Sequence, residues 1–395
     1  MRSSSNEKSL LIILSVALIV VSSTFLISIF ARGYQLDTSS GFKLKATGIL
    51  SVISKPKLAS VYVNNILTTA TDDTLNLVPG NYQIKITKDS YHPWGKNIQI
   101  KPELVNQVEA QLFRSTTELK PLTEHEIVNP VASPDKTKIV YAVASSSASY
   151  KETGLYLMEL TELPLIMSRS NERLLFPSTA SLDWSKYSFE FSPDSKQILA
   201  TNNDDATIYL LSLEQNQKIS SLFNVFSQLT QINKDWQVGK ERITKDKLAK
   251  IPTKLQSFIA TNSAVLFLNQ SEDKLVYQAS QNSQLPSFLP SLPPAQSTQT
   301  QQRNLNKDSY YVYDLKEDTN FLIGPSSLSQ LSWIPYSNNL LFIENNQIRV
   351  CDYDATNYLT IYTDSSPPML LVPTPDGYRL IISRDTLQSI TIKDR

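Results

Sequence analysis

The chain has 395 residues and a formal net charge of zero, from 37 Lys and Arg against 37 Asp and Glu. Its length predicts two or three domains, and the neutral balance gives no basic surface for nucleic acid. The single Cys excludes an intrachain disulfide and a cysteine-based zinc site. The two His lie far apart in the sequence, which argues against a histidine-rich metal site. The nine Gly are scattered and form neither a phosphate-binding loop nor a nucleophile elbow.

The first predicted element is an apolar helix at residues 10–31, which follows a short tail at residues 1–9. The run contains no charge and as a helix would reach roughly 33 Å, enough to cross a bilayer core. A cleaved signal peptide is the alternative, but its apolar part is usually about 7–15 residues and ends at a small-x-small site. We therefore expect an uncleaved transmembrane helix.

The orientation of this helix is not decided by its flanking charges, because Arg2 and Lys8 on one side balance Arg32, Lys43 and Lys45 on the other. A short tail before a large C-terminal part is the usual layout of a signal anchor. We expect a single-pass cell-membrane protein with its C-terminal domains on the extracellular or periplasmic side.

Residues 32–47 read as a polar tether, and residues 48–113 as a small β-sandwich. Alternating apolar and polar residues predict five or six strands here. The turn Val78-Pro79-Gly80-Asn81 supports this interpretation, because Pro presets φ and Gly accepts a positive φ. The predicted strands cover 48–54, 59–64, 80–87, 96–100 and 106–112.

The same segment resembles the PEGA domain, a small β module of bacterial and archaeal surface proteins. The resemblance rests on four motifs: Gly48-x-Leu50-x-Val52-x-Ser54-x-Pro56, Ala59-x-Val61-Tyr62-Val63-Asn64, Leu77-x-Pro79-Gly80-x-Tyr82-x-Ile84 and Tyr91-x-x-Trp94. Lys57-Leu58, Ala70-Thr71-Asp72 and Ser90 depart from the family pattern, and all three departures fall in turns.

Residues 115–395 contain a degenerate repeat of two apolar strands joined by a Ser-Pro-Asp-like turn, followed by a Leu- and Tyr-rich strand. In such a turn Pro presets φ and Asp can accept a hydrogen bond from a nearby N–H. Five copies are recognised, with their turns at 133–135, 192–194, 269–273, 335–339 and 373–377.

This repeat resembles the TolB-type, WD-repeat-like family, which implies an all-β fold with a five- or six-bladed β-propeller. A sixth blade would combine residues 116–128 with a C-terminal strand. Two insertions interrupt the repeat. A helical insertion at about 215–260 contains a charged stretch and then a helix after Pro252, and residues 281–307, rich in Ser, Pro and Gln, read as a flexible loop.

Candidate chemical groups are few, and each has a structural interpretation that we favour. His92 and His125 lack any nucleophile motif, and Cys351 lies in the middle of a strand. Asp135, Asp194 and Asp376 suit calcium by residue type, as does the cluster 202–205, but each reads better as a turn residue. Trp94, Trp184, Trp236 and Trp333 could provide a stacking surface for sugars or peptides, but Trp333 lies where inner strands carry core residues and is expected to pack in the core. We therefore assign no catalytic, cofactor-binding or metal-binding residue and expect no cofactor.

The expected function is non-catalytic binding or scaffolding at the cell envelope. The propeller would bind a protein, a peptide or a cell-wall polymer, and not nucleic acid. Two alternatives remain open: an envelope hydrolase with its site in the propeller channel, and a surface sensor that acts through a membrane partner.

Overall fold

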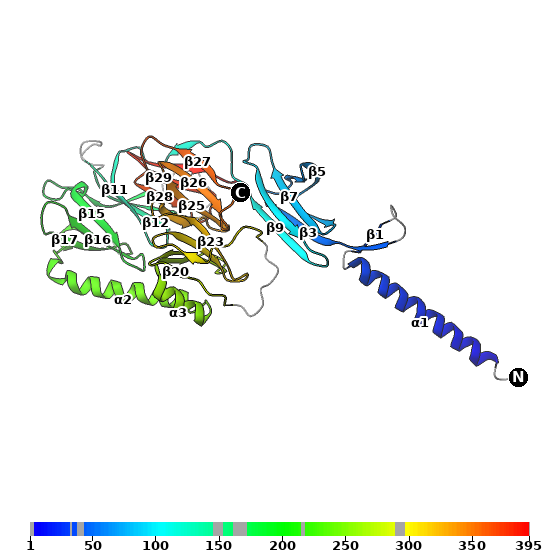
Figure 1. Ribbon diagram of the computed structural model, residues 1–395. Helices are drawn as coiled ribbons and strands as arrows, with labels where there is room; N and C mark the ends of the chain where they lie inside the picture. The colour runs from blue at the N-terminus through cyan, green and yellow to red at the C-terminus, as the bar shows by residue number, and fades with distance from the viewer. Residues whose placement is uncertain are drawn as a thin grey trace. The chain divides into compact units, whose positions relative to one another are not determined.

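The computed structural model describes residues 4–31, 34–37, 43–144, 153–160, 172–214, 218–288 and 297–394. It is mostly β, with 46% strand and 16% helix. The chain divides into two compact units (Figure 1). The first comprises Met1–Asp89, Pro93–Leu112 and Ala295–Thr298, and the second comprises Ser90–His92, Phe113–Pro294 and Gln299–Arg395.

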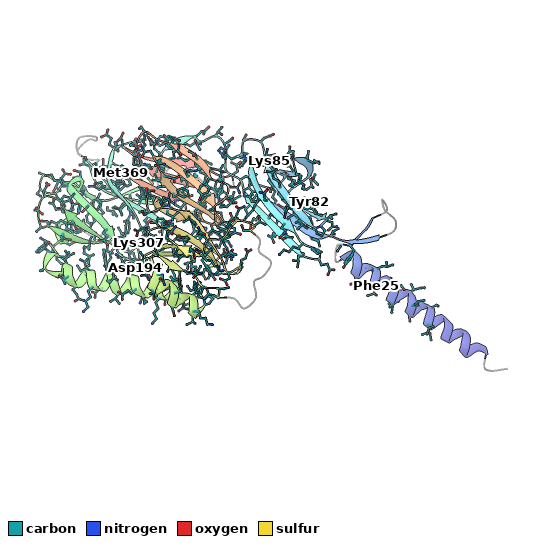
Figure 2. The ribbon with its side chains drawn as sticks, viewed as in Figure 1. Phe25, Tyr82, Lys85, Asp194, Lys307 and Met369 are labelled. Carbon is teal, nitrogen blue, oxygen red and sulfur yellow. The ribbon has the colours of Figure 1, made fainter. Side chains whose placement is uncertain are left out.

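The chain begins with a long helix, α1 (Ser4–Ala31), which contains the predicted apolar run. Its described apolar side chains face solvent all round; Phe25, labelled in Figure 2, is 65% exposed. Among the described residues no helix meets the length and hydropathy required to span a membrane, so the predicted transmembrane crossing is not supported.

Two short strands, β1 (Tyr34–Asp37) and β2 (Lys43–Ala46), pair antiparallel where a polar tether was expected. Residues 32–33 and 38–42 of that segment lie outside the described residues.

The first unit then forms two sheets that pack face to face. One has the order β6 (Asp73–Leu77), β3 (Gly48–Lys55), β9 (Val105–Gln111), and the other has β5 (Ile66–Ala70), β4 (Ser60–Val63), β7 (Gly80–Thr87), β8 (Trp94–Ile100). Alternate residues point inward, so Leu50, Val52, Ile84 and Ile86 are fully buried. Five of the seven strands match the predicted ones, and β5 and β6 were missed because the polar sequence at 66–77 lacks clear alternation.

The described residues of the second unit form five antiparallel sheets of three or four strands and one two-stranded sheet. In the first four of these larger sheets the strands lie side by side in chain order. The first is β11–β14 (Ile127–Ala132, Lys138–Val143, Gly154–Glu159, Glu172–Pro177), and the second is β15–β17 (Tyr187–Phe191, Gln197–Asn202, Ile208–Ser212). The third is β18, β19, β22, β23 (Ser263–Leu268, Lys274–Ala279, Tyr310–Asp314, Thr319–Gly324). The fourth is β24–β27 (Ser329–Trp333, Asn339–Glu344, Gln347–Asp352, Leu359–Thr363).

The fifth sheet joins the two ends of this unit. Strands β28–β30 (Leu370–Pro373, Arg379–Ser383, Leu387–Thr391) come from the C-terminus, and β10 (Leu119–Pro121) pairs with β30 from the N-terminal side. The segment proposed to start a sixth blade therefore completes the fifth sheet. No closed sheet or propeller is detected among the described residues, so the five- or six-bladed propeller stays a prediction.

Four of the sheet-to-sheet contacts are apolar and face to face. Val140 and Leu155 of the first sheet pack with Ile198 and Leu211 of the second. Comparable clusters join the third sheet to the fourth, the fourth to the fifth, and the fifth to the first. Because successive strand residues point to opposite faces, each sheet contributes to the core on both sides.

Helices replace the contact between the second and third sheets. In α2 (Leu229–Leu248), residues 229, 232, 236, 239 and 243 recur at helical spacing and turn toward the second sheet, where Trp236 packs on Leu199 and Ile208. In α3 (Thr253–Asn262), Leu255 and Ile259 pack on Leu275 and Tyr277 of the third sheet. Figure 1 shows both helices along one side of this unit.

The segment predicted as a flexible loop at 281–307 is ordered at both of its described ends. Strands β20 (Ser283–Gln284) and β21 (Asn304–Leu305) pair with each other. The buried carboxylate of Asp318 accepts hydrogen bonds from Ser287 Oγ at 2.6 Å and from Arg303 Nη2 at 3.0 Å. This correction has a physical cause, because a buried charge requires partners and the loop supplies them. Residues 289–296 lie outside the described part of the chain.

Candidate functional site

In three of the sheets, the turns β11–β12, β15–β16 and β28–β29 hold their own carboxylates. Asp135 accepts from Ser133 Oγ at 2.6 Å, Asp194 from Ser192 Oγ at 2.6 Å, and Asp376 from Thr374 Oγ1 at 2.5 Å. The hydrogen bond from Ser192 lowers the pKa of Asp194. These carboxylates are thus occupied by turn geometry, as the turn interpretation requires.

One residue of the corresponding turn has the left-handed conformation in all five of the larger sheets. Neighbouring turns touch one another. Asp135 N donates to Ser195 Oγ at 3.3 Å, and Tyr336 N donates to Gln270 Oε1 at 2.9 Å. These contacts gather the turns at one end of the second unit. The five left-handed residues are Lys136, Ser195, Glu272, Tyr336 and Gly377.

Helix α2 lies against these turns. A Cβ built on Gly239 would contact the ring of Pro193 at 3.6 Å, so the backbone of α2 comes close to the second turn. Lys240 pairs with Glu190 of β15 at 3.4 Å, and Lys250, just past α2, pairs with Glu272 in the turn of the third sheet. The helix therefore runs from the second sheet to the third.

A pocket of about 260 Å³ opens between α2 and the turn of the second sheet. Its apolar side consists of Leu210, Ile232 and Trp236, and its polar side includes Gln197 and Arg242, with Asp194 and Asp235. Asp194 is labelled beside α2 in Figure 2. A second pocket, of about 40 Å³, lies between the other end of α2 and the third sheet and is lined by Lys247, Leu248 and Phe267.

In the part of the chain that the structure describes, two positively charged residues lie near the turns and α2 without a carboxylate partner in an ion pair. Burial and the positive charge of Lys247 lower the pKa of Lys136 to about 8. The guanidinium of Arg242 has no ion pair among the described residues, and Arg242 is exposed at the pocket edge. Such a pocket, with an apolar wall and a few charges of both signs, is suited to binding an amphipathic group.

Of the candidate residues named in the sequence analysis, only Asp194 and Trp236 line this pocket. Trp94, Trp184, Trp236 and Trp333 are all buried. The backbone N–H of His92 donates to Phe113 O, and the backbone carbonyl of His125 accepts from Thr123 Oγ1. Asn202 Oδ1 and Asp205 Oδ1 accept N–H groups of their own hairpin at 2.9 and 2.7 Å.

Cys351 is fully buried, and burial raises the pKa of its thiol well above the ordinary value. Among the described residues, no three His, Cys, Asp or Glu side chains lie close enough together to hold a metal ion.

Comparison with known proteins identifies one part of the chain. Residues 47–115 match the model of the PEGA domain. The predicted PEGA resemblance is therefore confirmed for this segment, which contains the two sheets of the first unit. No curated protein matches the sequence.

Among solved structures, the crystal structure of TolB from Acinetobacter baumannii is similar, with 12% identity and a TM-score of 0.22. The similarity covers 80% of this chain and 60% of that one, so the chain spans less than two thirds of the TolB structure.

Sequence reasoning missed the pocket because its two walls are far apart in the chain. The sequence predicts a turn at Ser192-Pro193-Asp194 and a helix in the charged stretch 240–250. Neither segment contains a pattern that shows that the two are neighbours in the fold. The only available signal was the apolar stripe at 232, 236, 239 and 243, which requires some surface to cover it.

Proposed function

We propose that this chain is a non-catalytic binding protein of the cell envelope, and that its partner binds at the pocket between α2 and the turn Ser192–Asp194. The pocket is the observation that carries the proposal. It combines the apolar wall of Trp236 and Leu210 with the exposed charge of Arg242, and it lies on a helix held by an ion pair at Lys240 and by another at Lys250, just past its end. The partner is a protein, a peptide or a cell-wall polymer.

The fold that we propose for the second unit is a propeller-like ring of five sheets, with α2 and α3 in the position of a further blade. Four apolar sheet contacts and the β10–β30 pairing support this arrangement. The helices would close the ring because they cover the faces of the second and third sheets that face no other sheet.

We further propose that α1 holds the protein at the outer side of the cell membrane. Support comes from its 28 residues and from apolar side chains such as Leu18 and Ile27, both 68% exposed, for which water is a poor environment. Retention of the full chain in membranes after alkaline extraction is expected, and release into the supernatant contradicts the anchor. Protease added to intact cells should digest the second unit; digestion only after lysis would contradict the outer location.

Filling the pocket tests the binding site directly. Gly239→Leu places a side chain in the pocket, whereas Gly239→Ala adds only a Cβ at an ordinary contact distance from Pro193. A photo-reactive residue at Gln197 in the full chain should cross-link to an envelope component in intact cells. The product should persist with Gly239→Ala and disappear with Gly239→Leu. Cross-linking that is equal in both variants, or no cross-linking at all, would overturn the proposal.

A further inference from the structure

The helical insertion carries a concentration of positive charge that the rest of the chain lacks. Residues 218–262 contain eight Lys and Arg against three Asp and Glu, although the whole chain is neutral. Lys240 and Lys250 are neutralised by Glu190 and Glu272. Within the described residues the remaining exposed cations of α2 and α3 make no ion pair: Lys234, Arg242, Lys245, Lys247 and Lys254.

The outward face of α2 presents part of this charge in a line. Residues 234, 241 and 245 project away from the buried stripe at 232, 236, 239 and 243. Lys234 and Lys245 are eleven residues apart, or about 16 Å along the helix axis. Glu241 lies between them and accepts a hydrogen bond from Gln237 Nε2 at 2.9 Å.

An exposed lysine also lies on the side of α2 that faces the turn of the first sheet. Lys247 faces Lys136 in the turn of the first sheet, where the two like charges and burial lower the pKa of Lys136. Like charges held together in a folded protein cost free energy, and a bound anion reduces that cost.

We propose that the exposed face of α2, with the first turn of α3, binds a linear polymer that carries repeated phosphate groups. This inference goes beyond the proposed function, because it adds a second binding face on the side of α2 opposite the pocket. Lysine ammonium groups bind phosphate as mobile point charges, and a row of them suits a flexible chain with regularly spaced charges.

A lipid surface fits this face less well. Helices that lie on membranes insert an apolar face between the lipids, but the apolar stripe of α2 is turned inward against the second sheet. Single-stranded nucleic acid fits less well too, because its binding sites use exposed aromatic rings for stacking. Trp236, which is buried, is the only aromatic residue of α2.

The test uses the full chain in detergent and inorganic polyphosphate as the probe. A triple variant, Lys234→Gln, Lys245→Gln and Lys254→Gln, removes three unpaired charges outside the pocket. The control, Lys55→Gln, Lys186→Gln and Lys196→Gln, removes three lysines that are paired with Glu109, Asp204 and Glu214. Circular dichroism of both proteins verifies folding.

We expect wild type and control to bind polyphosphate and the triple variant to bind at least tenfold more weakly. The slope of log affinity against log salt concentration should fall by about 2 in the triple variant, since each contact with a single-stranded polyanion contributes about 0.7. Equal loss in both variants, absence of binding in wild type, or preference for anionic lipid vesicles or for DNA over polyphosphate would overturn the inference.

The pocket variant separates this inference from the proposed function. Gly239→Leu should leave polyphosphate binding unchanged, because the polymer face is on the other side of the helix. A wild-type chain that does not bind polyphosphate, with a cross-link that is lost only in Gly239→Leu, therefore contradicts only the polymer inference. A cross-link that persists in Gly239→Leu, with polyphosphate binding weakened only in the triple variant, contradicts only the pocket proposal.

Discussion

Asn129 and Gln330 occupy equivalent places in two different sheets. Each lies at a bulge in the first strand of its sheet and has a positive φ, 54° and 52°. Each donates its side-chain amide to backbone carbonyls of the following sheet: Asn129 to Tyr187 O at 2.8 Å, and Gln330 to Pro368 O at 3.2 Å. The bulge turns a side chain out of the strand ladder, and that side chain then links two sheets.

Asn129→Gly tests this link. Glycine keeps the positive φ but removes the amide, so the variant should lose about 1–2 kcal/mol of stability in urea denaturation. Asn345→Gly is the matched control, because Asn345 also has a positive φ but is an exposed residue of a hairpin turn. Its stability should change little. Equal effects in the two variants would show that backbone entropy, and not the amide bond, is responsible.

Lys274 is the buried cation of the third sheet. Its ammonium lies 3.0 Å from Asp314, whose side chain is only 2% exposed, and above the ring of Tyr353. Lys274→Met leaves that carboxylate buried without its charge partner, so we expect a loss of about 3–5 kcal/mol in chemical denaturation. Lys186→Met removes an exposed ion pair with Asp204 and should change the midpoint little. A small loss for Lys274→Met would mean that Asp314 finds another partner.

Lys136 predicts a pH dependence. Burial, with help from Lys247, lowers its pKa to about 8 in the folded state, against about 10.4 in an unfolded chain. Between these values the unfolded chain binds more protons, so the contribution of Lys136 to stability rises with pH. Lys136→Met should therefore be more stable than wild type below pH 8, and the gain should shrink toward pH 10. Lys245→Met controls for net charge. A gain that does not vary with pH would contradict this assignment.

The thiol of Cys351 should not react while the protein is folded, because burial both blocks access and raises its pKa. An aromatic disulfide reagent at pH 8 should label the native chain no faster than the chain unfolds, and label it at once in urea. Fast labelling of the native protein would show that the fourth sheet opens locally. Cys351→Ala removes the signal and serves as the blank.

Local chemistry explains which parts of the fold could be predicted. The turn at Ser192–Asp194 is readable because Pro193 and Asp194 act on their own backbone, and β7 is readable because Tyr82, Ile84 and Ile86 alternate. The pairing of distant segments leaves no comparable pattern in the local sequence. Residues 116–128 were expected to combine with a C-terminal strand, but the short, polar strand at 119–121 does not reveal that it completes the fifth sheet rather than a sixth.

The same distinction applies to the candidate site. Trp236 is a buried residue that the sequence offered only as a possible stacking surface, and its partners Leu199 and Ile208 are in another segment, so the pocket beside it could not be derived. The order of the 281–307 insertion was missed because Asp318, which holds both of its described ends, lies outside that insertion.

The β10–β30 pairing has a consequence for biosynthesis. The hydroxyl of Ser389 donates to Lys120 O across 269 positions of sequence, so the fifth sheet is incomplete until Leu387–Thr391 has left the ribosome. Until then the first and fourth sheets each expose an apolar face that β28–β30 will cover, and such faces are targets for chaperones and proteases. A nascent chain that stops before Leu387 would lack β30 and leave both faces incompletely covered.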